Sequence, residues 1–403
     1  MTSNLPLLIN ESEEKVFEFY NNLNSDKTHY KSNDDICTPM ECVKVMVDYL
    51  PDKFWSNKDL NILDACCGNG NFGAYTKFKT NIDNITFNDL NADRLSNLKS
   101  ILNPKNIINK NILEIDEFNT WDLIIANPPY SGGGNKNRSI SNQIIEHSVK
   151  LLRKDGYLCF ITPNNWMTYN NNNTTLKMLL NEGSFLVIDN DAKKYFPQVG
   201  SSFTIFLWQK GVFDNETLVI NKFLQKDVQK VFIPRDIPCI PLYISQTVID
   251  IFQKCVKKEL SGFNYRCDLH NFTQKNLLSD IQTAEFKFET IHTPNKTRFA
   301  KIKQDIYDKW TIIIPLSTYF IPYIKKNVNT TQSVGYFSFD TEEDAYNYLN
   351  ILSSKWIKVV IHITRYGNFN NIKVLKHLNL NEKINFTENE VKEIDSLHSL
   401  IKY

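Results

Sequence analysis

The sequence predicts an α/β fold with a mostly parallel sheet, followed by a C-terminal α+β region. Over residues 36–210, short apolar runs alternate with helical patterns, and the connections between them are short. This alternation is typical of a parallel sheet, because each parallel pair needs a crossover. After Lys210 this regular alternation of apolar runs and helical patterns ends. We therefore expect an N-terminal extension over residues 1–35, an α/β domain over 36–210 and a second domain over 211–403.

Seven short apolar runs are the candidate strands of the α/β domain. They are Asn61–Ala65, Asn84–Asn88, Ile107–Asn109, Asp122–Ala126, Gly156–Thr162, Phe185–Asp189 and Phe203–Gln209. Upstream, Thr38 and Pro39 precede an apolar-periodic stretch. This pattern predicts a helix with Thr38 at its N-cap and Pro39 at its first position. Residues 1–35 are polar, and we expect them to be irregular or short-helical.

The C-terminal half has no simple period and predicts a mixture of strands and helices. The segment Ile233–Pro241 carries three prolines, which indicates a linker or an irregular entry into the second domain. Thr341-x-x-Asp344 and Thr387-x-x-Glu390 are typical of helix starts. The strand-like runs of this half are Trp310–Ile314, Gly335–Phe339 and Val359–Ile363.

Composition narrows the functional classes. The chain has 403 residues, of which 42% are hydrophobic, so it can bury two cores. No apolar run reaches membrane-spanning length, and the N-terminus is typical of neither a secretory signal nor a transit peptide. We expect a cytoplasmic protein (in the host cytoplasm, if it is viral) with no membrane partner. The eight cysteines and seven histidines show no metal-ligand spacing, so we predict reduced cysteines and no metal site.

A glycine-rich turn follows the first candidate strand. Gly68, Gly70 and Gly73 fit G-x-G-x-x-G, the spacing of a dinucleotide-binding turn. Asp89 ends the next strand, where nicotinamide cofactors and S-adenosylmethionine both place a ribose. Asp64, just before the turn, favours the cationic ammonium group of S-adenosyl-L-methionine and would repel a pyrophosphate. The turn therefore predicts an S-adenosylmethionine site, with a nicotinamide site as the alternative.

A second motif, Asn127-Pro128-Pro129-Tyr130, follows the strand candidate that ends at Ala126. Ligands of open α/β sheets bind beyond the carboxyl ends of the strands, so both motifs are expected at one crevice. The Asn127 side-chain carbonyl and the Pro128 backbone carbonyl can accept two hydrogen bonds from the exocyclic amine of a base. These bonds free a lone pair that is otherwise delocalised into the ring. Tyr130 offers a flat face for stacking on the base.

These motifs resemble those of a known family. The shared elements, in order, are Thr38-Pro39, Asp64, Gly68-Asn69-Gly70, Asp89 and Asn127–Tyr130. They are similar to the gamma class of adenine-N6 DNA methyltransferases of restriction–modification systems. The resemblance covers residues 30–210 well and extends loosely to Gly335–Asn350 and Ser353–His362. It implies a Rossmann-like methyltransferase domain with helices on both faces of its sheet, and a C-terminal α+β target-recognition domain. The implied activity is site-specific transfer of a methyl group from S-adenosylmethionine to a flipped adenine.

The resemblance also implies roles for single residues. Thr38 would contact the cofactor's methionine carboxylate, and Asp64, Gly68 and Gly70 would line its methionine part. Asp89 would bind the ribose hydroxyls, Leu90 would pack on the cofactor adenine, and Ile112 would also contact the cofactor. Asn127, Pro128 and Tyr130 would hold the target base, and Phe196 would be a second aromatic against it. An ordinary core phenylalanine is the alternative for Phe196. The family has an aspartate after the third strand, and here Asn111 stands at that position, with Asp116 as the alternative.

The C-terminal half carries the candidate DNA contacts. Residues 211–403 hold 25 Lys+Arg against 21 Asp+Glu, although the whole chain has a net charge of only +1. Lys296, Arg298, Lys301 and Lys303, with phenylalanines nearby, suit phosphate contact and stacking on double-stranded DNA. A solvated face is the alternative. We expect a monomer, with any cognate restriction endonuclease on a separate chain.

Two other functional classes stay open. An Asn-Pro-Pro-Tyr segment also occurs in methyltransferases that act on RNA bases or on protein glutamine, because an amide poses the same chemical problem. A DNA-binding relative without catalysis is the second alternative. The large C-terminal region favours a nucleic acid, and the order of the motifs favours DNA. Methylated DNA, methylated RNA or binding without transfer would separate the three.

Overall fold

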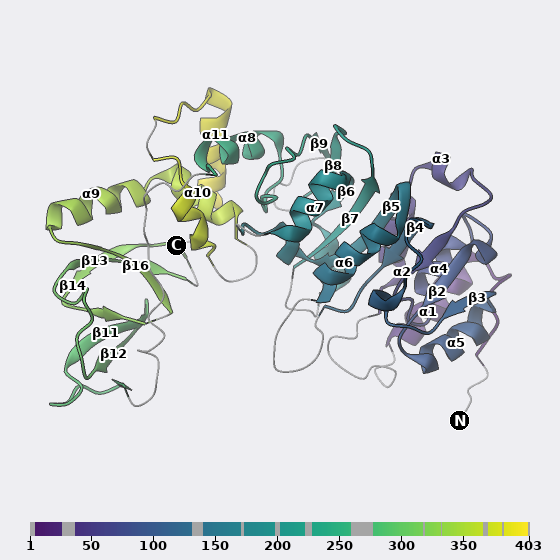
Figure 1. Cartoon of the computed structure of the whole chain (residues 1–403), viewed down its shortest axis with the longest axis horizontal. Coiled ribbons are helices and arrows are strands. Elements are labelled where there is room, and N and C mark those ends of the chain that lie inside the picture. The colour runs from purple at the N-terminus through teal and green to yellow at the C-terminus, as the bar shows by residue number, and fades with distance from the viewer. Residues whose placement is uncertain are drawn as a thin grey trace. The chain divides into compact units, whose positions relative to one another are not determined.

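The computed structural model describes residues 5–25, 37–130, 140–170, 173–197, 202–221, 228–258, 277–316, 319–331, 333–365, 370–380 and 383–401. The chain divides into two compact units (Figure 1). The first contains Met1–Trp166 and Asn173–Asp236, and the second contains Met167–Asn172 and Ile237–Tyr403. The division after Asp236 lies inside the proline-rich segment, not at the expected boundary after Lys210. Two further strands of the first sheet follow Lys210, and their hydrogen bonds to that sheet hold them in the first unit.

The first unit is built on a nine-stranded sheet of order β3-β2-β1-β4-β5-β7-β6-β8-β9. The strands are β1 (Ile62–Asp64), β2 (Ile85–Asn88), β3 (Asn106–Ile108), β4 (Trp121–Ala126), β5 (Leu152–Pro163), β6 (Gly183–Asp189), β7 (Phe203–Lys210), β8 (Thr217–Ile220) and β9 (Gln229–Val231). From β3 to β5 all pairs are parallel, and β7 runs antiparallel between β5 and β6. This sheet confirms the predicted α/β class, and all seven candidate strands are present. Every residue of β4 is buried, which explains its unbroken apolar run.

In the first unit, α1 to α3 precede the first strand, and α4 to α7 connect strands of the sheet (Figure 1). These helices are α1 (Glu13–Ser25), α2 (Met40–Asp48), α3 (Asp52–Trp55), α4 (Asn71–Thr76), α5 (Ala92–Leu102), α6 (Ile140–Leu151) and α7 (Thr174–Glu182), with 3₁₀ turns at Ile82–Asn84, Ile112–Glu114, Asn164–Met167 and Ala192–Tyr195. The helix predicted at Thr38 starts at Met40, and Pro39 holds the cap position without a side-chain cap bond. The predicted N-cap role of Thr38 is therefore wrong. The Thr38 hydroxyl instead accepts a hydrogen bond from Asn127.

Helix α1 is part of the first unit and not a separate extension. Val16 and Tyr20 on α1 are fully buried in the same apolar core as the sheet. The Tyr20 hydroxyl donates to the backbone carbonyl of Asn69 at 3.0 Å. The Lys77 ammonium donates to the carbonyls of Leu8, Ile9 and Glu11 at 2.7–3.0 Å, which anchors the chain before α1. The described part of residues 1–35 is therefore more ordered than its polar composition predicts.

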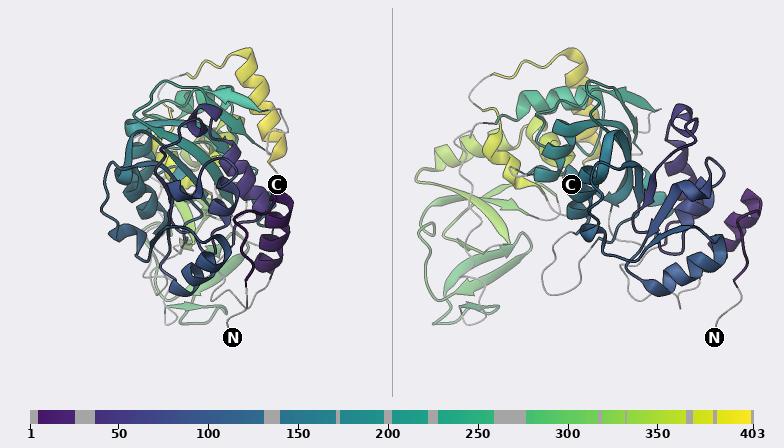
Figure 2. Two further views of the ribbon diagram at one scale, coloured as in Figure 1. Left: turned by 90° about the vertical axis from the view of Figure 1, so that its right-hand side faces the viewer. Right: turned by 45° about the vertical axis from the view of Figure 1, so that its right-hand side comes forward.

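The second unit combines two small antiparallel-rich sheets with helices, as the predicted α+β class requires. One sheet has the order β10-β12-β11-β15 and the other β14-β13-β16. The strands are β10 (Leu278–Ser279), β11 (Phe288–Thr293), β12 (Lys296–Ala300), β13 (Trp310–Pro315), β14 (Tyr323–Lys326), β15 (Asn329–Thr330) and β16 (Val334–Phe339). The helices are α8 (Gln246–Cys255), α9 (Glu342–Leu352), α10 (Lys355–Ile363) and α11 (Glu388–Leu400), with a 3₁₀ turn at Ile372–His377. Helix α9 packs on the three-stranded sheet, whereas α8, α10 and α11 pack together (Figure 2).

Local sequence signals in the second unit had mixed outcomes. Thr341 caps α9, and Thr387 forms a complete capping box with Glu390 at the start of α11, as predicted. The strand predicted at Val359–Ile363 is wrong, because this run is the second half of α10. A short apolar run has no period that separates a buried helix from a strand, and here packing against α8 and α11 decides.

Among the described residues, no helix is long and apolar enough to cross a membrane.

Candidate active site

The two sequence motifs meet where the strand order reverses. Strand β1 lies between β2 and β4, so the turn after β1 and the segment after β4 leave the sheet side by side. This is the position at which open α/β sheets bind their ligands. A cavity of about 320 Å³ opens there. Its lining includes most of the predicted site residues, namely Thr38, Gly68, Asp89, Leu90, Asn111, Ile112, Asn127, Pro128 and Tyr130.

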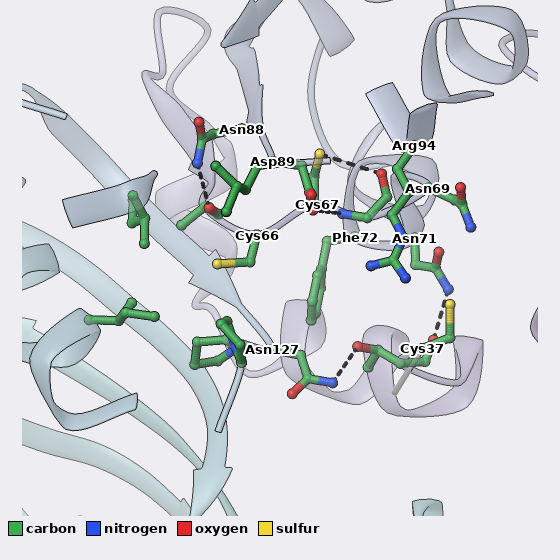
Figure 3. Close-up of a pocket in the computed structure, with 18 of the residues that line it drawn as sticks. Cys37, Cys66, Cys67, Asn69, Asn71, Phe72, Asn88, Asp89, Arg94 and Asn127 are labelled. Atoms are coloured by element: carbon green, nitrogen blue, oxygen red, sulfur yellow. Dashed lines mark hydrogen bonds between the residues drawn. The ribbon is translucent and has the colours of Figure 1, made fainter. Parts of the chain in front are cut away.

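The glycine turn depends on backbone conformations that other residues rarely adopt. Gly68 and Gly70 have φ angles of +55° and +89°. A Cβ atom at Gly70 would lie 2.2 Å from Leu98 Cδ1, so α5 packs directly against the turn. The Gly68 amide donates to Asp89 Oδ2 at 2.8 Å, and the Asn91 amide donates to Asp89 Oδ1 at 2.8 Å. The turn and the Asp89 carboxylate are thus fixed together at one wall of the cavity (Figure 3).

Asp64 lies at the end of β1, behind the cavity wall. Its side chain is fully buried, and neither carboxylate oxygen has a hydrogen-bond partner among the described residues. Burial, together with the nearby charge of Asp89, raises the pKa of Asp64 well above its ordinary value. The Gly73 amide offsets part of this increase in pKa, although it lies outside hydrogen-bond geometry. A cationic ligand close to this carboxyl group would stabilise its charged form, so the site favours a cation.

The Asn127 amide is held at both ends. Its nitrogen Nδ2 donates to Thr38 Oγ1 at 3.1 Å, and its oxygen Oδ1 accepts from the Tyr130 hydroxyl at 2.5 Å. Burial raises the pKa of Tyr130, so its hydroxyl stays a neutral donor. The backbone carbonyl of Thr38 accepts from Asn71 Nδ2 at 2.9 Å. Figure 3 shows Asn127 across the cavity from Asn88 and Asp89, with its amide directed at the segment that carries Cys37.

The structure separates the two candidates for the position after the third strand. Asn111 lines the cavity, whereas Asp116 is exposed and does not. The Asn111 side-chain oxygen accepts from the Leu113 amide at 3.1 Å and so caps the 3₁₀ turn Ile112–Glu114. Leu90 is 73% exposed at the rim of the cavity. A ligand here would cover an apolar side chain that the protein alone leaves in water.

Phe196 does not line the cavity. It is 4% exposed and belongs to the apolar core of the first unit. Its ring lies 5.3 Å from that of Phe203, whose ring in turn lies 5.2 Å from that of Tyr130. Phe196 therefore supports Tyr130 through Phe203. No sequence signal selects Phe203, because nothing in a strand of apolar residues indicates which ring contacts the motif.

Other residues at the cavity were also missed by the sequence analysis. Cys37, Cys66, Asn71 and Arg94 line it. Three of them are close neighbours of Thr38 or of the glycine turn in the sequence, so their proximity to the motifs was the available signal. Arg94 comes from the first turn of α5, where a cation is unremarkable in sequence. No described cysteine forms a disulfide, and the described residues contain no metal-binding cluster.

The four candidate DNA contacts all lie in the second unit, on or just after β12. Each forms an ion pair with an acid of the same unit. Lys296 and Arg298 lie 3.5 and 2.7 Å from Asp280, respectively. The other two pairs are Lys301 with Glu285 at 2.6 Å and Lys303 with Asp308 at 2.8 Å. The structure therefore shows the four cations paired with three acids, so the surface is less basic than these cations alone would make it.

Known proteins share this sequence pattern. Residues 46–196 match the family model of the Eco57I restriction-modification methylase. The Type II methyltransferase M.HincII of Haemophilus influenzae is 26% identical over 277 residues, which cover 62% of this chain and 53% of that protein. M.HindII from the same species is 25% identical over 314 residues, covering 66% and 58%. The chain thus spans somewhat more than half the length of these relatives. Ribosomal RNA small subunit methyltransferase C of Buchnera aphidicola is 32% identical over 108 residues, covering 26% of this chain and 33% of that protein.

Solved structures share the fold. The DrdV enzyme, determined in a DNA complex, has a TM-score of 0.58 at 9% identity and covers 97% of this chain and 60% of its own. The Type IIL restriction-modification enzyme MmeI, also determined with DNA, has a TM-score of 0.56 at 10% identity, covering 91% and 67%. These likenesses agree with the predicted Rossmann-like sheet followed by a further domain. The sequence of residues 46–196 is thus similar to the Eco57I restriction-modification methylase, and the fold is similar to that of these solved structures.

Proposed function

We propose that this chain is a site-specific DNA methyltransferase that transfers a methyl group from S-adenosylmethionine to N6 of a flipped adenine in double-stranded DNA. The observation that carries the proposal is the placement of Asn127 and Pro128 in one cavity with the glycine turn. The family match over residues 46–196 and the Type II relatives support DNA as the substrate.

The cavity residues fit the cofactor. Asp64 does not line the cavity but lies directly before the lining residue Ala65. It is a buried carboxylate with no hydrogen-bond partner among the described residues, and the cofactor's ammonium group nearby would compensate its charge. Asp89 retains acceptor capacity for ribose hydroxyls, because a carboxylate has about four lone-pair sites and two are in use. Leu90 and Ile112 would contact the cofactor adenine, and Asn111 its amine. When bound, S-adenosylmethionine supplies a methyl group activated by its sulfonium.

The catalytic segment prepares the base amine. The Asn127 amide oxygen and the Pro128 carbonyl accept from the two N–H bonds, and so favour a nitrogen whose lone pair can attack. The Tyr130 hydroxyl already bonds this amide oxygen, so the amine either displaces the hydroxyl or uses the second lone pair. Tyr130 then stacks on the base, held from behind by Phe203 and Phe196. Bringing adenine out of the duplex costs a few kcal/mol.

The second unit would recognise the target. We assign phosphate contacts to Lys296, Arg298, Lys301 and Lys303, which would exchange their acidic partners for DNA phosphates on binding. We further propose that the protein acts as a monomer in the cytoplasm. Any cognate restriction endonuclease would be a separate chain.

The test is incubation with methyl-labelled S-adenosylmethionine and unmethylated mixed-sequence duplex DNA, followed by nucleoside analysis. Wild type should produce N6-methyladenine, and Asn127→Ala should reduce the single-turnover rate about 10²–10³-fold, because it removes one electrostatic contact to the reacting amine. S-adenosylhomocysteine should still bind Asn127→Ala. The matched control is Asn57→Ala, which removes an exposed asparagine of the same unit and should keep full activity.

An RNA-base methyltransferase is the second candidate, because the ribosomal RNA methyltransferase of Buchnera has higher identity over its shorter match. A parallel reaction with ribosomal RNA separates the two. Label in RNA alone, or in protein alone, would contradict the DNA proposal. Specific DNA binding with no transfer would indicate a non-catalytic relative.

A further inference from the structure

We propose that Thr38 is a positioning residue for the catalytic amide of Asn127. This inference rests on the proposed function and extends it. The resemblance gives Thr38 a contact with the cofactor carboxylate, whereas the structure places its hydroxyl on the group that would hold the target base. Thr38 would therefore affect the rate of methyl transfer itself, apart from any effect on cofactor affinity.

The geometry begins with burial. Thr38 is 5% exposed and lines the same cavity as Asn127, although the two residues are 89 positions apart in the chain. Asn127 Nδ2 donates to Thr38 Oγ1 at 3.1 Å, and the Thr38 backbone carbonyl accepts from Asn71 Nδ2 at 2.9 Å. Asn71 is buried at the first position of α4, directly after the glycine turn. Thr38 thus links the cofactor side of the cavity to the catalytic segment.

The chemistry explains why this bond matters. A side-chain amide has a donor end and an acceptor end, and rotation about its last torsion exchanges them. The target amine needs the acceptor end. When Thr38 Oγ1 accepts from Nδ2, the oxygen Oδ1 faces the other way, where it now meets the Tyr130 hydroxyl. Loss of the Thr38 hydroxyl would let the amide rotate and present N–H groups to the amine, which lowers the reactive fraction.

The hydroxyl can be removed almost without changing shape. Thr38→Val keeps the branched side chain and the backbone carbonyl that bonds Asn71, and removes only the oxygen that bonds Asn127. Thr38→Ser keeps that oxygen and removes a methyl group. The matched control is Thr217→Val, because Thr217 is also a buried threonine of the first unit, with its hydroxyl bonded to the Phe185 carbonyl at 2.9 Å. Thr217 lies on β8, outside the cavity lining.

Two quantities should be measured for each variant. The first is the dissociation constant for S-adenosylhomocysteine, by calorimetry. The second is the single-turnover rate of N6-methyladenine formation on unmethylated plasmid DNA at saturating cofactor. We expect Thr38→Val to lower the rate about 10–100-fold, in the range that misplacing a reacting group produces. Its S-adenosylhomocysteine affinity should change by less than about 3-fold, because the lost bond is to Asn127 and not to the cofactor. Thr38→Ser should restore most of the rate, and Thr217→Val should keep it.

Three results would overturn the inference. A Thr38→Val enzyme that binds S-adenosylhomocysteine weakly but recovers full rate at saturation has lost only a cofactor contact. A Thr38→Ser enzyme as slow as Thr38→Val shows that shape matters and not the hydroxyl. An equal loss in Thr217→Val shows a general effect on the fold. Failure of the proposed function is seen separately, because wild type would then form no methylated adenine in DNA.

Discussion

The two regions proposed to bind ligands, one in each unit, differ in how their charged groups are compensated. In the first unit, the Asp64 carboxylate is fully buried and has no hydrogen-bond partner among the described residues. In the second unit, the cations that the sequence singled out, such as Arg298, already lie beside acids at the surface. A buried group without compensation is costly for the protein alone, whereas a surface ion pair contributes little in either direction. The uncompensated Asp64 carboxylate therefore indicates that a cationic ligand binds near it. This is a stronger indication of a binding site than the ion-paired cations of the second unit provide.

The backbone of the glycine turn gives the largest expected effect. Gly70→Ala would force an L-residue to a φ of +89° and place its Cβ 2.2 Å from Leu98 Cδ1. We expect a loss of about 3 kcal/mol in the free energy of unfolding, since positive φ costs about 1–2 kcal/mol and overpacking about 1–3. Urea denaturation of the full chain, monitored by a probe in the first unit, measures this loss of unfolding free energy.

Gly68→Ala is the control for this prediction. Gly68 also has a positive φ, of +55°, but an added Cβ would meet no atom within 4 Å. Its cost should be the backbone part alone, about 1 kcal/mol. If the two variants lost equal stability, the close packing of α5 on the turn would have no energetic role.

Asp64→Asn tests the uncompensated carboxylate directly. The substitution removes the buried charge behind the cavity wall that would attract the cofactor's ammonium group, so S-adenosylhomocysteine affinity should fall about 30–100-fold, in line with losing a buried charge interaction. Without ligand, the same variant should unfold at a higher temperature than wild type at neutral pH. The pKa of Asp64 is raised in the folded state, so its favourable contribution exists at low pH and is lost as the pH rises through that pKa.

The melting temperature of both proteins against pH, with and without S-adenosylhomocysteine, is the measurement. The advantage of Asp64→Asn should shrink as the pH falls, because wild-type Asp64 then becomes neutral as well. With S-adenosylhomocysteine bound at neutral pH, wild type should have the higher melting temperature of the two proteins. Equal ligand affinity in both would remove Asp64 from the site and weaken the contrast between the units.

His362 in the second unit should give the opposite dependence on pH. Burial, with a smaller contribution from Arg365, lowers the pKa of His362 to about 4, and the Tyr243 hydroxyl lies 3.0 Å from its Nε2. The unfolded chain has the higher pKa, so it binds the extra proton between about pH 6.5 and 4. The second unit should therefore lose about 2–3 kcal/mol of stability as the pH falls through this window. His362→Gln should make the stability of the second unit depend less on pH, which calorimetric unfolding from pH 7 to 4 measures. If stability fell as steeply with pH in the variant as in wild type, other groups would dominate the pH dependence.

Sequence reasoning succeeded where the signal was local. The continuous apolar run of Trp121–Ala126 and the capping pair of Thr387 with Glu390 are determined by neighbours along the chain. It failed where distant segments decide. The bond from Tyr20 to Asn69 spans 49 positions, and helix α10 forms at Val359–Ile363 because other helices cover it. The pairing of Arg298 with Asp280 likewise depends on the antiparallel register of β10 and β12, which composition does not encode.

The ion pairs of the second unit give the smallest expected effect. Asp280 holds both Lys296 and Arg298, so Asp280→Asn should release two cations and tighten binding to mixed-sequence duplex DNA about 3-fold at 0.1 M salt. Arg298→Met should weaken binding by a similar factor and reduce the slope of log K against log salt by about 0.9, the value for one phosphate contact. The control is Asp340→Asn, which changes the net charge equally but releases only Lys309, outside the candidate cluster. If Asp340→Asn tightened binding as much as Asp280→Asn, net charge alone would explain the effect. If Arg298→Met abolished binding, the ion-paired surface at β12 would be an essential DNA contact, and the contrast between the two regions would fail.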